Sequence, residues 1–405
     1  MTDLPPPPPS LFQIELTNVC NIDCSMCARS SGLSRPIGHM DIELFKKIVL
    51  EAARLKMPIH WLHHFGETLA YPHLEEALAF FKEHGHGPGA VSTNVILLND
   101  EKIDILLNNC SYILCCIDSM DPEAYVKIRV NKHFEKVKTN IEKLILRHQE
   151  TGSNSKIAIQ FLRTQHNRNE DIIDMIEHFG DHPNVKYIEK RTDKHPKGAD
   201  ITLVDWEDIA MQKTQCSKIR SELCVLASGE CTACCWDADG EMIIGDVRTK
   251  SLADIWQGQI HRMMQLRLRM GAFGELPLCD KCTGPVIDPD FGVVEQVNAW
   301  ADDWREANLR VALAPASQAN LRLLRKTRLR NNVITALFDA NPDAERDLSG
   351  LPDPVPPILG YDSVGDVRPD IILIYSPRFS SEIYFQLRHL REQGIRLVVL
   401  GGHLD

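Results

Sequence analysis

The feature that most constrains the fold is a regular exchange of strand-like and helix-like segments between residues 11 and 189. Short apolar or β-branched runs alternate there with longer stretches of helical periodicity, which is typical of a parallel sheet wrapped by helices. The expected strands are 11–17, 59–65, 90–94, 112–117, 156–162 and 185–189. Six such units predict an α/β fold with a partial (β/α)6 TIM-like barrel, whose functional residues follow the strands.

The rest of the chain predicts further domains. Residues 1–10 form a Pro-rich flexible tail, the barrel extends over 11–205, and 191–198 reads as a linker. Residues 206–290 show little periodicity but hold most of the remaining cysteines, which indicates a small metal-held domain. A helical linker at 291–308 then leads to strands at 310–313, 333–338, 371–375 and 397–400, with a helix at 385–392. These predict a C-terminal Rossmann-like α/β domain over 309–405.

Composition excludes several classes of protein. The 405 residues carry a net charge of −11, which argues against a general nucleic-acid binder. No apolar run approaches the roughly 20 residues of a membrane-spanning helix. Five consecutive prolines stand where a signal peptide would have its apolar stretch, so we expect a cytoplasmic protein. Because the cytosol keeps thiols reduced, the thirteen cysteines of this chain should bind metal or do redox chemistry.

Three cysteines follow the first expected strand in one short loop, Cys20, Cys24 and Cys27. Iron–sulfur cubanes ordinarily take four thiolates. A cubane held by three keeps one iron open, where a small molecule can coordinate, as it does at a catalytic zinc with three protein ligands. The alternatives are a three-cysteine zinc site completed by a histidine, or plain buried thiols.

This C-x3-C-x2-C loop after strand one of a partial barrel resembles the signature of the radical S-adenosylmethionine (SAM) family. The resemblance implies that SAM chelates the open iron of a [4Fe-4S] cluster through its amino and carboxyl groups. It also implies that one electron cleaves SAM to methionine and a 5′-deoxyadenosyl radical, which abstracts a hydrogen atom from the substrate. Such chemistry belongs to the cofactor, and the protein positions it and excludes competing reactions.

Residues after the next two strands fit the same resemblance. Gly66, Glu67 and Thr68 resemble the family's Gly-Glu-Pro motif, with threonine in place of proline, and the motif implies contact with the methionine amino group. Glycine there lets the backbone approach the ligand. Ser92 and Asn94 resemble the segment that contacts the SAM ribose.

Later strands supply three further candidates. Asp118 and Ser119 resemble the family's Ser-x-Asp segment, with Cys116 where serine is common. Arg163 ends the fifth strand, and we expect it either to anchor the SAM carboxylate or to form a structural ion pair.

A second group of cysteines resembles the auxiliary-cluster domains called SPASM and twitch. Cys216 and Cys234 frame Gly229 with the C-x(9–15)-G-x4-C spacing that opens these domains, and Cys279 and Cys282 complete four ligands. No cysteine follows Cys282, which implies one auxiliary [4Fe-4S] cluster. The spacing is similar to that of the radical dehydrogenase of 2-deoxystreptamine biosynthesis.

Four thiolates saturate such a cluster, so it cannot bind substrate. Its remaining roles are electron transfer and structural support. Cys224, Cys231 and Cys235 stay unassigned, and Cys235 in place of Cys234 is one alternative. A zinc ribbon with four cysteine ligands is another.

The C-terminal region resembles the Rossmann-like domain attached to some sugar C-methyltransferases. Its carrying residues include 311–313, 337–342 and 369–373. The first turn, at 314–319, lacks the Gly-rich loop that lets backbone amides approach a pyrophosphate, so docking or carrier recognition is as open as nucleotide binding.

Together these features predict a radical SAM oxidoreductase that abstracts a substrate hydrogen atom and passes an electron to the auxiliary cluster. The dehydrogenase-like spacing and the sugar-enzyme-like tail favour a sugar or cyclitol alcohol as the small-molecule substrate. An electron donor such as flavodoxin or ferredoxin is the implied partner, with neither nucleic acid nor membrane. The alternatives are a peptide- or protein-modifying radical SAM enzyme, an epimerase, or a zinc-stabilised binding protein without catalysis.

Overall fold

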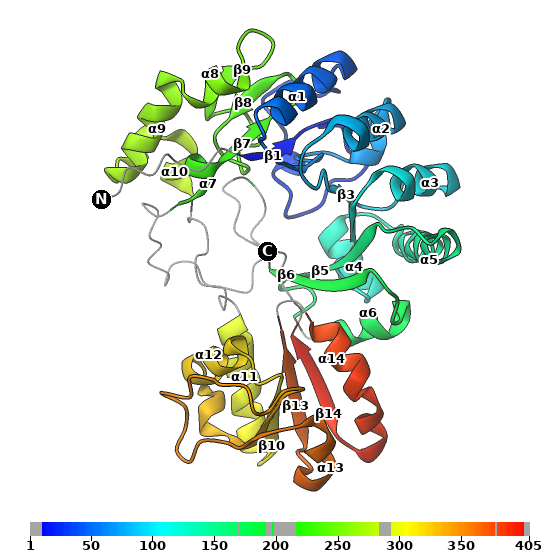
Figure 1. The fold of residues 1–405 in the computed structure, drawn as a ribbon, viewed down its shortest axis with the longest axis vertical. Helices are drawn as coiled ribbons and strands as arrows, with labels where there is room; N and C mark the ends of the chain where they lie inside the picture. Colours follow the sequence, from blue (N-terminus) through cyan, green and yellow to red (C-terminus); the bar gives the residue numbers. More distant parts are fainter. Residues whose placement is uncertain are drawn as a thin grey trace. The chain divides into compact units, whose positions relative to one another are not determined.

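The computed structural model describes residues 10–168, 170–191, 197, 216–282, 293–376 and 379–400. The chain divides into two compact units. The first comprises Met1–Ile159 with Thr192–Pro285, and the second comprises Gln160–Arg191 with Val286–Asp405. Both units are of the α/β class (Figure 1). Of the predicted tail at 1–10, only Ser10 is described, and it begins the first strand. Most of the predicted linker at 191–198 lies outside the described residues.

The N-terminal part of the first unit alternates strands and helices, as predicted. Its strands are β1 (Ser10–Ile14), β2 (Ile59–Trp61), β3 (Val91–Thr93), β4 (Tyr112–Cys116) and the first half of β5 (Lys156–Arg163). The helices between them are α1 (Ile42–Arg54), α2 (Leu74–His84), α3 (Asp100–Asn109), α4 (Pro122–Arg129) and α5 (Phe134–Thr151). Side-chain caps start most of these helices, as Asp41 does by accepting a hydrogen bond from the Leu44 amide.

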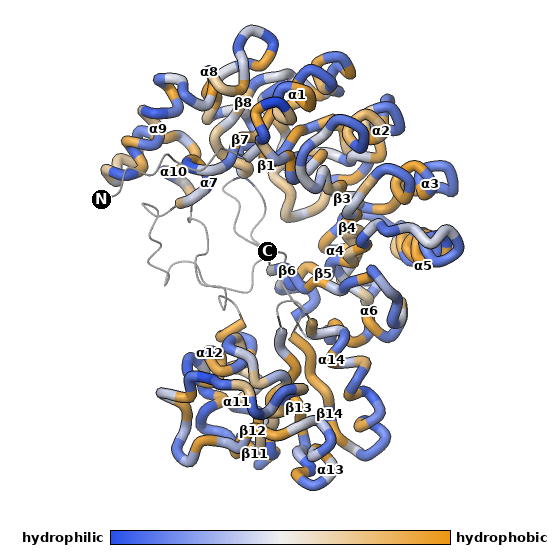
Figure 2. Tube along the Cα trace, in the orientation of Figure 1, coloured by the Kyte–Doolittle hydropathy of each residue, from blue (hydrophilic) through white to orange (hydrophobic). Residues whose placement is uncertain are grey.

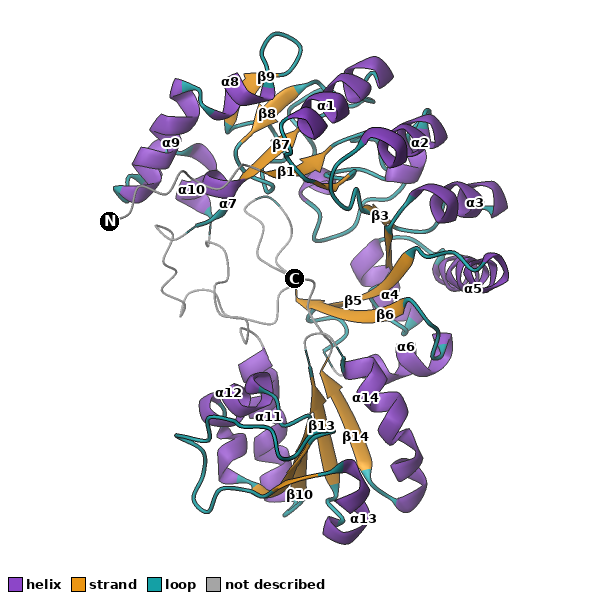
Figure 3. Cartoon of the chain, viewed as in Figure 1, coloured by secondary structure: helices purple, strands orange, loops and turns teal. Residues whose placement is uncertain are grey.

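The cysteine-rich part of the first unit holds short elements (Figure 3). They are α7 (Lys218–Ser221), β7 (Glu222–Val225), β8 (Glu230–Thr232), β9 (Ile243–Asp246), α8 (Leu252–Trp256), α9 (Gln259–Arg269) and α10 (Pro277–Lys281). Strands β8 and β9 pair in antiparallel fashion as a hairpin.

The cysteine-rich part shares a sheet with the barrel, in the order β2-β1-β7-β8-β9. Strand β7 pairs in parallel with β1, so Gln13 lies opposite Cys224 and Ile14 opposite Val225. Strands β3 and β4 pair in parallel in a second sheet, and an isolated bridge between Trp61 and Ala90 connects the ends of β2 and β3. Only the partial barrel was predicted; the extension of its sheet by β7 was not.

The second unit begins within β5 and continues with α6 (Ile172–Phe179) and β6 (Val185–Arg191). Its larger part is a parallel sheet in the order β12-β11-β10-β13-β14. The strands are β10 (Arg310–Ala314), β11 (Val333–Phe338), β12 (Ile358–Leu359), β13 (Ile371–Tyr375) and β14 (Arg396–Leu400). The helices are α11 (Val293–Glu306), α12 (Gln318–Lys326), α13 (Val364–Val367) and α14 (Ser380–Leu387).

Sheets of this kind are buried on both faces, and β13 throughout and β14 after Arg396 are accordingly apolar (Figure 2). The predicted Rossmann-like architecture is therefore confirmed. The last predicted helix is displaced, because α14 starts at Ser380 and a 3-10 helix at Arg388–Gln393 replaces the expected helical end.

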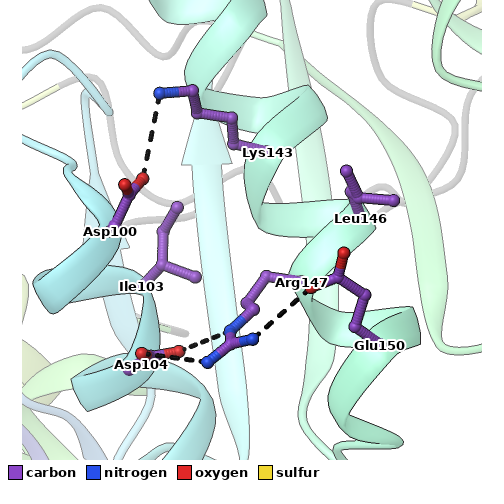
Figure 4. A pocket seen from close by; sticks show the side chains of 7 residues that line it. All are labelled: Asp100, Ile103, Asp104, Lys143, Leu146, Arg147 and Glu150. Carbon is purple, nitrogen blue, oxygen red and sulfur yellow. Dashed lines mark hydrogen bonds and ion pairs between the residues drawn. The ribbon is translucent and has the colours of Figure 1, made fainter.

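One shallow hollow lies on the outer helices of the first unit, between α3 and α5 (Figure 4). It has a volume of about 320 Å³, and charged side chains dominate its lining. Arg147 pairs with Asp104 at 2.8 Å across it. The exposed ion pairs that line this hollow are typical of a solvated helix surface. Within the described ranges, no helix has the length and apolar character needed to cross a bilayer.

A buried carboxylate joins the barrel to the cysteine-rich part. Glu15, directly after β1, is fully buried and accepts two hydrogen bonds from Arg35, at 2.5 and 2.7 Å. It also accepts hydrogen bonds from the amides of Ala227, at 2.9 Å, and Phe65, at 3.3 Å. Arg35 Nε in turn donates to the Ala238 carbonyl. These bonds connect β1, the loop after β2 and the cysteine-rich part.

We predict that Glu15→Gln destabilises the protein by about 3–5 kcal/mol, because it leaves the buried Arg35 without its counter-charge. Chemical denaturation followed by circular dichroism measures the loss. The matched control is Glu43→Gln on α1, whose carboxylate is 74% exposed beside Lys46 and whose change should leave the transition in place. Equal stability of the two variants would contradict the structural role assigned to Glu15.

Candidate active site

The loop 20–27 follows β1 and carries three thiols close to one another. The Cys27 amide donates to the Cys24 carbonyl at 3.1 Å, and the Ser25 amide donates to the Ile128 carbonyl at 3.0 Å, which holds the loop against α4. Arg29 supports the other side by donating to the carbonyl of Asn18 at 3.0 Å. The loop is therefore shaped by the protein's own hydrogen bonds.

Burial raises the pKa of Cys20 to about 11 and raises that of Cys27, while each thiol also interacts electrostatically with Cys24. Buried thiols lose their protons readily only where a cation compensates the thiolate charge. Such a donor set suits a soft, thiolate-binding metal centre.

Glu67 and Asn94 form one polar network beside this loop. The buried Glu67 carboxylate accepts hydrogen bonds from the amides of Leu69, at 3.0 Å, and Asn94, at 2.7 Å. Burial raises the pKa of Glu67, and the bond from Asn94 opposes that effect. Asn94 Nδ2 donates to Asn21 Oδ1 at 2.8 Å and lies 3.9 Å from Cys20 Sγ. Two residues predicted to contact SAM thus lie next to the cysteine loop.

The structure gives a protein-packing reason for glycine at position 66. Its φ is +108°, and a Cβ there would stand 2.5 Å from the Thr17 carbonyl oxygen. The glycine therefore allows the loop after β2 to approach the backbone that leads into the cysteine loop, whereas the sequence suggested an approach to a ligand. Thr68, in place of the motif's proline, is buried and directs its hydroxyl to the Leu62 carbonyl at 3.4 Å.

Asp118 and Arg129 form a second network beside the cysteine loop. Asp118 is fully buried, has a φ of +68°, and forms an ion pair with Arg129. Arg129 lies at the end of α4 and directs Nη1 to Cys24 Sγ at 3.4 Å. Its buried Nε has no hydrogen-bond partner among the described residues.

The remaining predicted residues have local partners. Ser119 bonds the backbone of Asp121 at 3.0 Å, and Ser92 Oγ lies 3.5 Å from Cys116 Sγ. Arg163 is in the second unit, where it donates to Glu189 at 3.0 Å and to the carbonyls of Asn167 and Glu170. These bonds favour the structural ion pair over the SAM anchor for Arg163.

The second group of cysteines lies around the end of β7 and the turn after β8. The Cys234 thiol interacts electrostatically with Cys235 and Cys216, and the Cys224 thiol interacts with Cys235 and Cys234. Burial raises the pKa of Cys234 and of Cys224 well above the ordinary value. Cys231 stands apart from this group, since its thiol interacts electrostatically with the carboxylates of Asp246 and Glu51.

A partly buried lysine contacts this second group. Lys218 Nζ donates to Cys235 Sγ at 3.1 Å. Burial opposes its charge, but Cys235 and Glu222 hold its pKa above the ordinary value. Cys279 lies in α10, and Cys282 directly follows that helix.

A histidine connects the loop after β2 to the second cysteine group. His64 Nε2 lies 2.8 Å from the Cys235 carbonyl oxygen, and because a carbonyl only accepts, Nε2 carries the hydrogen. Burial lowers the pKa of His64 and so favours the neutral ring. The loop of Gly66 and Glu67 is thereby bonded directly to the cysteine turn after β8.

Arg129, Lys218 and Glu15 were missed by sequence reasoning. A signal existed for Arg129, because it follows the buried Tyr125 by one helical turn and therefore shares the inner face of α4. Lys218 and Glu15 carry no such signal, since their roles depend on the β1–β7 pairing.

Comparison with known families agrees with this geometry. Residues 14–185 match the Radical SAM superfamily model, residues 216–283 match an iron-sulfur cluster-binding domain (SPASM), and residues 292–400 match a C-methyltransferase C-terminal domain. Residues 14–185 thus form a radical SAM domain. More particularly, the chain combines it with a SPASM domain, as the cysteine spacing predicted. These domains imply a SAM-binding [4Fe-4S] cluster and auxiliary cluster chemistry.

Individual relatives are distant. A curated protein from Pyrococcus furiosus, the tungsten-containing aldehyde ferredoxin oxidoreductase cofactor-modifying protein, is 31% identical over 91 residues, or 22% of this chain. The match spans only a quarter of that relative's length.

Among solved structures, BtrN in complex with AdoMet and 2-DOIA is 16% identical, with 69% of this chain and 93% of that chain covered and a TM-score of 0.44. Streptococcus suis SuiB bound to precursor peptide SuiA is 14% identical, with 64% and 66% covered and a TM-score of 0.50, a likeness of fold alone.

The described residues fit the implied groups. Three neighbouring thiols after β1 supply one ligand fewer than a saturated cluster needs, and the second group supplies thiols beside a partly buried lysine.

We predict that Arg129→Met lowers the reduction potential of the SAM-binding cluster by roughly 60 mV, a tenfold change in a one-electron equilibrium, since hydrogen bonds to the sulfurs help set the potential. Potentiometric titration followed by electron paramagnetic resonance (EPR) measures it. Arg129→Lys should lower the reduction potential by less than Arg129→Met does, and Arg147→Met on α5 is the surface control. A wild-type potential in Arg129→Met would refute the contact with Cys24.

Proposed function

We propose that the protein is a radical SAM oxidoreductase that removes a hydrogen atom from a substrate carbon and passes the remaining electron to an auxiliary [4Fe-4S] cluster. The observation that carries the proposal is the buried hydrogen bond from His64 to the Cys235 carbonyl. It joins the loop of Glu67, beside the first cysteine group, to the turn of the second group. An oxidation that must deliver an electron from one site to the other needs such a fixed arrangement.

The chain's residues would hold the two groups as follows. Cys20, Cys24 and Cys27 supply three thiolates after β1, and Cys216, Cys234, Cys279 and Cys282 supply four in the SPASM domain. Bound there, SAM and its cluster would supply hydrogen-atom abstraction, and the auxiliary cluster would supply one-electron acceptance.

Glu67 and Asn94 order the wall of the site next to Cys20, and Asp118 orients Arg129 against Cys24. Gly66 brings its loop against the backbone at 17–18. Ser92 lies in β3 and Ser119 lies shortly after β4, and we place contacts to SAM there.

A sugar or cyclitol alcohol is the proposed substrate. Oxidation of such a carbon removes one hydrogen atom, one proton and one electron, which together amount to two hydrogens. The proposal rests on the cysteine spacing, which is similar to that of a cyclitol dehydrogenase, and on the C-terminal domain of C-methyltransferase type. Modification of a peptide and epimerisation are the competing outcomes of the same chemistry.

The test uses anaerobically reconstituted protein with a chemical reductant and SAM. We expect about eight irons per chain and formation of 5′-deoxyadenosine. Mass analysis of candidate cyclitols, sugars and peptides should show loss of two hydrogens from an alcohol substrate. Solvent deuterium incorporated without that loss would mean epimerisation, and absence of 5′-deoxyadenosine would sink the enzymatic proposal.

Two cysteine variants separate the roles of the two groups. Cys24→Ala should abolish 5′-deoxyadenosine formation, because it removes a ligand of the SAM-binding cluster. Cys234→Ala should retain 5′-deoxyadenosine formation but lose the oxidised product, because the electron has no acceptor. Cys231→Ala, which changes a buried thiol outside both groups, is the matched control. Retained product in Cys234→Ala would show that the auxiliary cluster takes no electron.

A further inference from the structure

Helix α9 of the cysteine-rich part has an unusual outer surface. Ile260, Met263 and Leu266 are 53%, 42% and 46% exposed, and Met270, which caps the helix, is 73% exposed. These four are a third of the twelve large hydrophobic side chains exposed in the described parts of the chain. We name them the α9 stripe. Single exposed apolar residues need no explanation, but a contiguous group marks an interaction site.

The stripe occupies one face of the helix. Its members recur at intervals of three and four residues and fall within about a third of the helix circumference. The buried residues of α9, His261 and Leu268, lie on the opposite face. A surface helix ordinarily turns its polar side to water, whereas α9 turns the apolar stripe to water. Figure 2 shows hydrophobic and hydrophilic positions interspersed along it.

The stripe is flanked by positive charge in an acidic chain. No aspartate or glutamate occurs between Asp254 and Glu275, whereas Arg262, Arg267 and Arg269 do. Arg267 pairs with Glu275 at 2.9 Å. Arg262 and Arg269 form no ion pair among the described residues. An apolar centre with uncompensated arginines at its edge complements an acidic protein surface.

Helix α9 is bonded to the segment that carries the first auxiliary cysteine. His261 Nε2 lies 2.7 Å from the carbonyl of Ile219, in α7. Ile219 directly follows Lys218, which contacts Cys235, and lies three residues after Cys216. The stripe is therefore the outer face of a helix whose inner face contacts the surroundings of the proposed auxiliary cluster.

We propose that the α9 stripe, with Arg262 and Arg269, is the docking surface for an acidic one-electron carrier protein of the ferredoxin type. The inference rests on the proposed function and adds the route of its electron. Substrate oxidation leaves one electron on the auxiliary centre, and the docked carrier accepts it. The carrier is reduced by one electron, the auxiliary centre is reoxidised by one, and no bond or proton changes.

The test measures binding of a plant-type [2Fe-2S] ferredoxin to the anaerobically reconstituted full chain by calorimetry, at low and at physiological salt. We expect binding that weakens as salt rises. Arg262→Glu combined with Arg269→Glu should weaken it by roughly tenfold at low salt, because like charges then face each other. Met263→Asp should weaken it at both salt concentrations.

Matched controls carry the same changes on α5. Lys132→Glu with Lys136→Glu, beside and within α5, reverses two exposed charges, and Leu146→Asp places a charge at a residue 56% exposed. Both should bind ferredoxin as the wild type does. Wild-type binding by the α9 variants, or no binding by the wild type, would overturn the proposal. The proposal would also be overturned if sedimentation showed a dimer that Met263→Asp abolishes. The same holds if the protein bound anionic phospholipid vesicles through α9 in place of ferredoxin.

A second measurement separates this inference from the proposed function. With a chemical reductant, the α9 variants should form 5′-deoxyadenosine at the wild-type rate, because the stripe lies outside the cysteine groups. Absence of 5′-deoxyadenosine formation in the wild type would refute the enzymatic proposal and leave the binding result intact. Normal activity with failed ferredoxin binding would refute only the docking surface.

Discussion

The structure depends first on the buried carboxylate of Glu15. Its four hydrogen bonds hold together the end of β1, the loop after β2, the arginine at position 35 and the amide of Ala227. A fully buried carboxylate is costly unless it is paired and hydrogen-bonded, and here both conditions are met. Because β1 also pairs with β7, the same region fixes both the loop of Cys20–Cys27 and the strand of Cys224.

The two cysteine groups follow a common electrostatic pattern. Arg129 directs a nitrogen to Cys24, and Lys218 directs one to Cys235. Each cation is paired with a carboxylate, Asp118 in one case and Glu222 in the other, so neither is left alone in the interior. Clusters held by thiolates carry negative charge, and nearby donors to the sulfurs help to set their reduction potentials. A cation beside each cysteine group therefore suits two redox centres better than two inert thiol pockets.

Much of the fold was predictable because its strands are buried on both faces. Strands 333–338 and 371–375 match β11 and β13 throughout, and the expected strands of the barrel match β1 to β6 within a few residues at each end. The cysteine spacing also predicted the radical SAM and auxiliary-cluster domains, since ligand spacing in a short loop is a local property.

The parts that sequence reasoning missed are long-range. Pairing of β1 with β7 joins residues more than two hundred positions apart, and no local periodicity announces it. The role of Arg129 depends on Asp118 and Cys24 lying on one side of the loop, and that of His64 on a carbonyl in another part of the chain. Residues 385–392 were expected to be helical, but the helix ends at Leu387 because a 3-10 segment takes over.

The central claim is that the loop after β1 holds a cluster with one open iron at which SAM binds. The most direct measurement is EPR of the reduced, oxygen-free Cys234→Ala protein before and after addition of SAM. We expect the g-values of the remaining cluster signal to change when SAM is added, because a ligand joins the open iron. A cluster signal that SAM leaves unaltered, or the absence of any cluster with Cys20, Cys24 and Cys27 intact, would contradict the account.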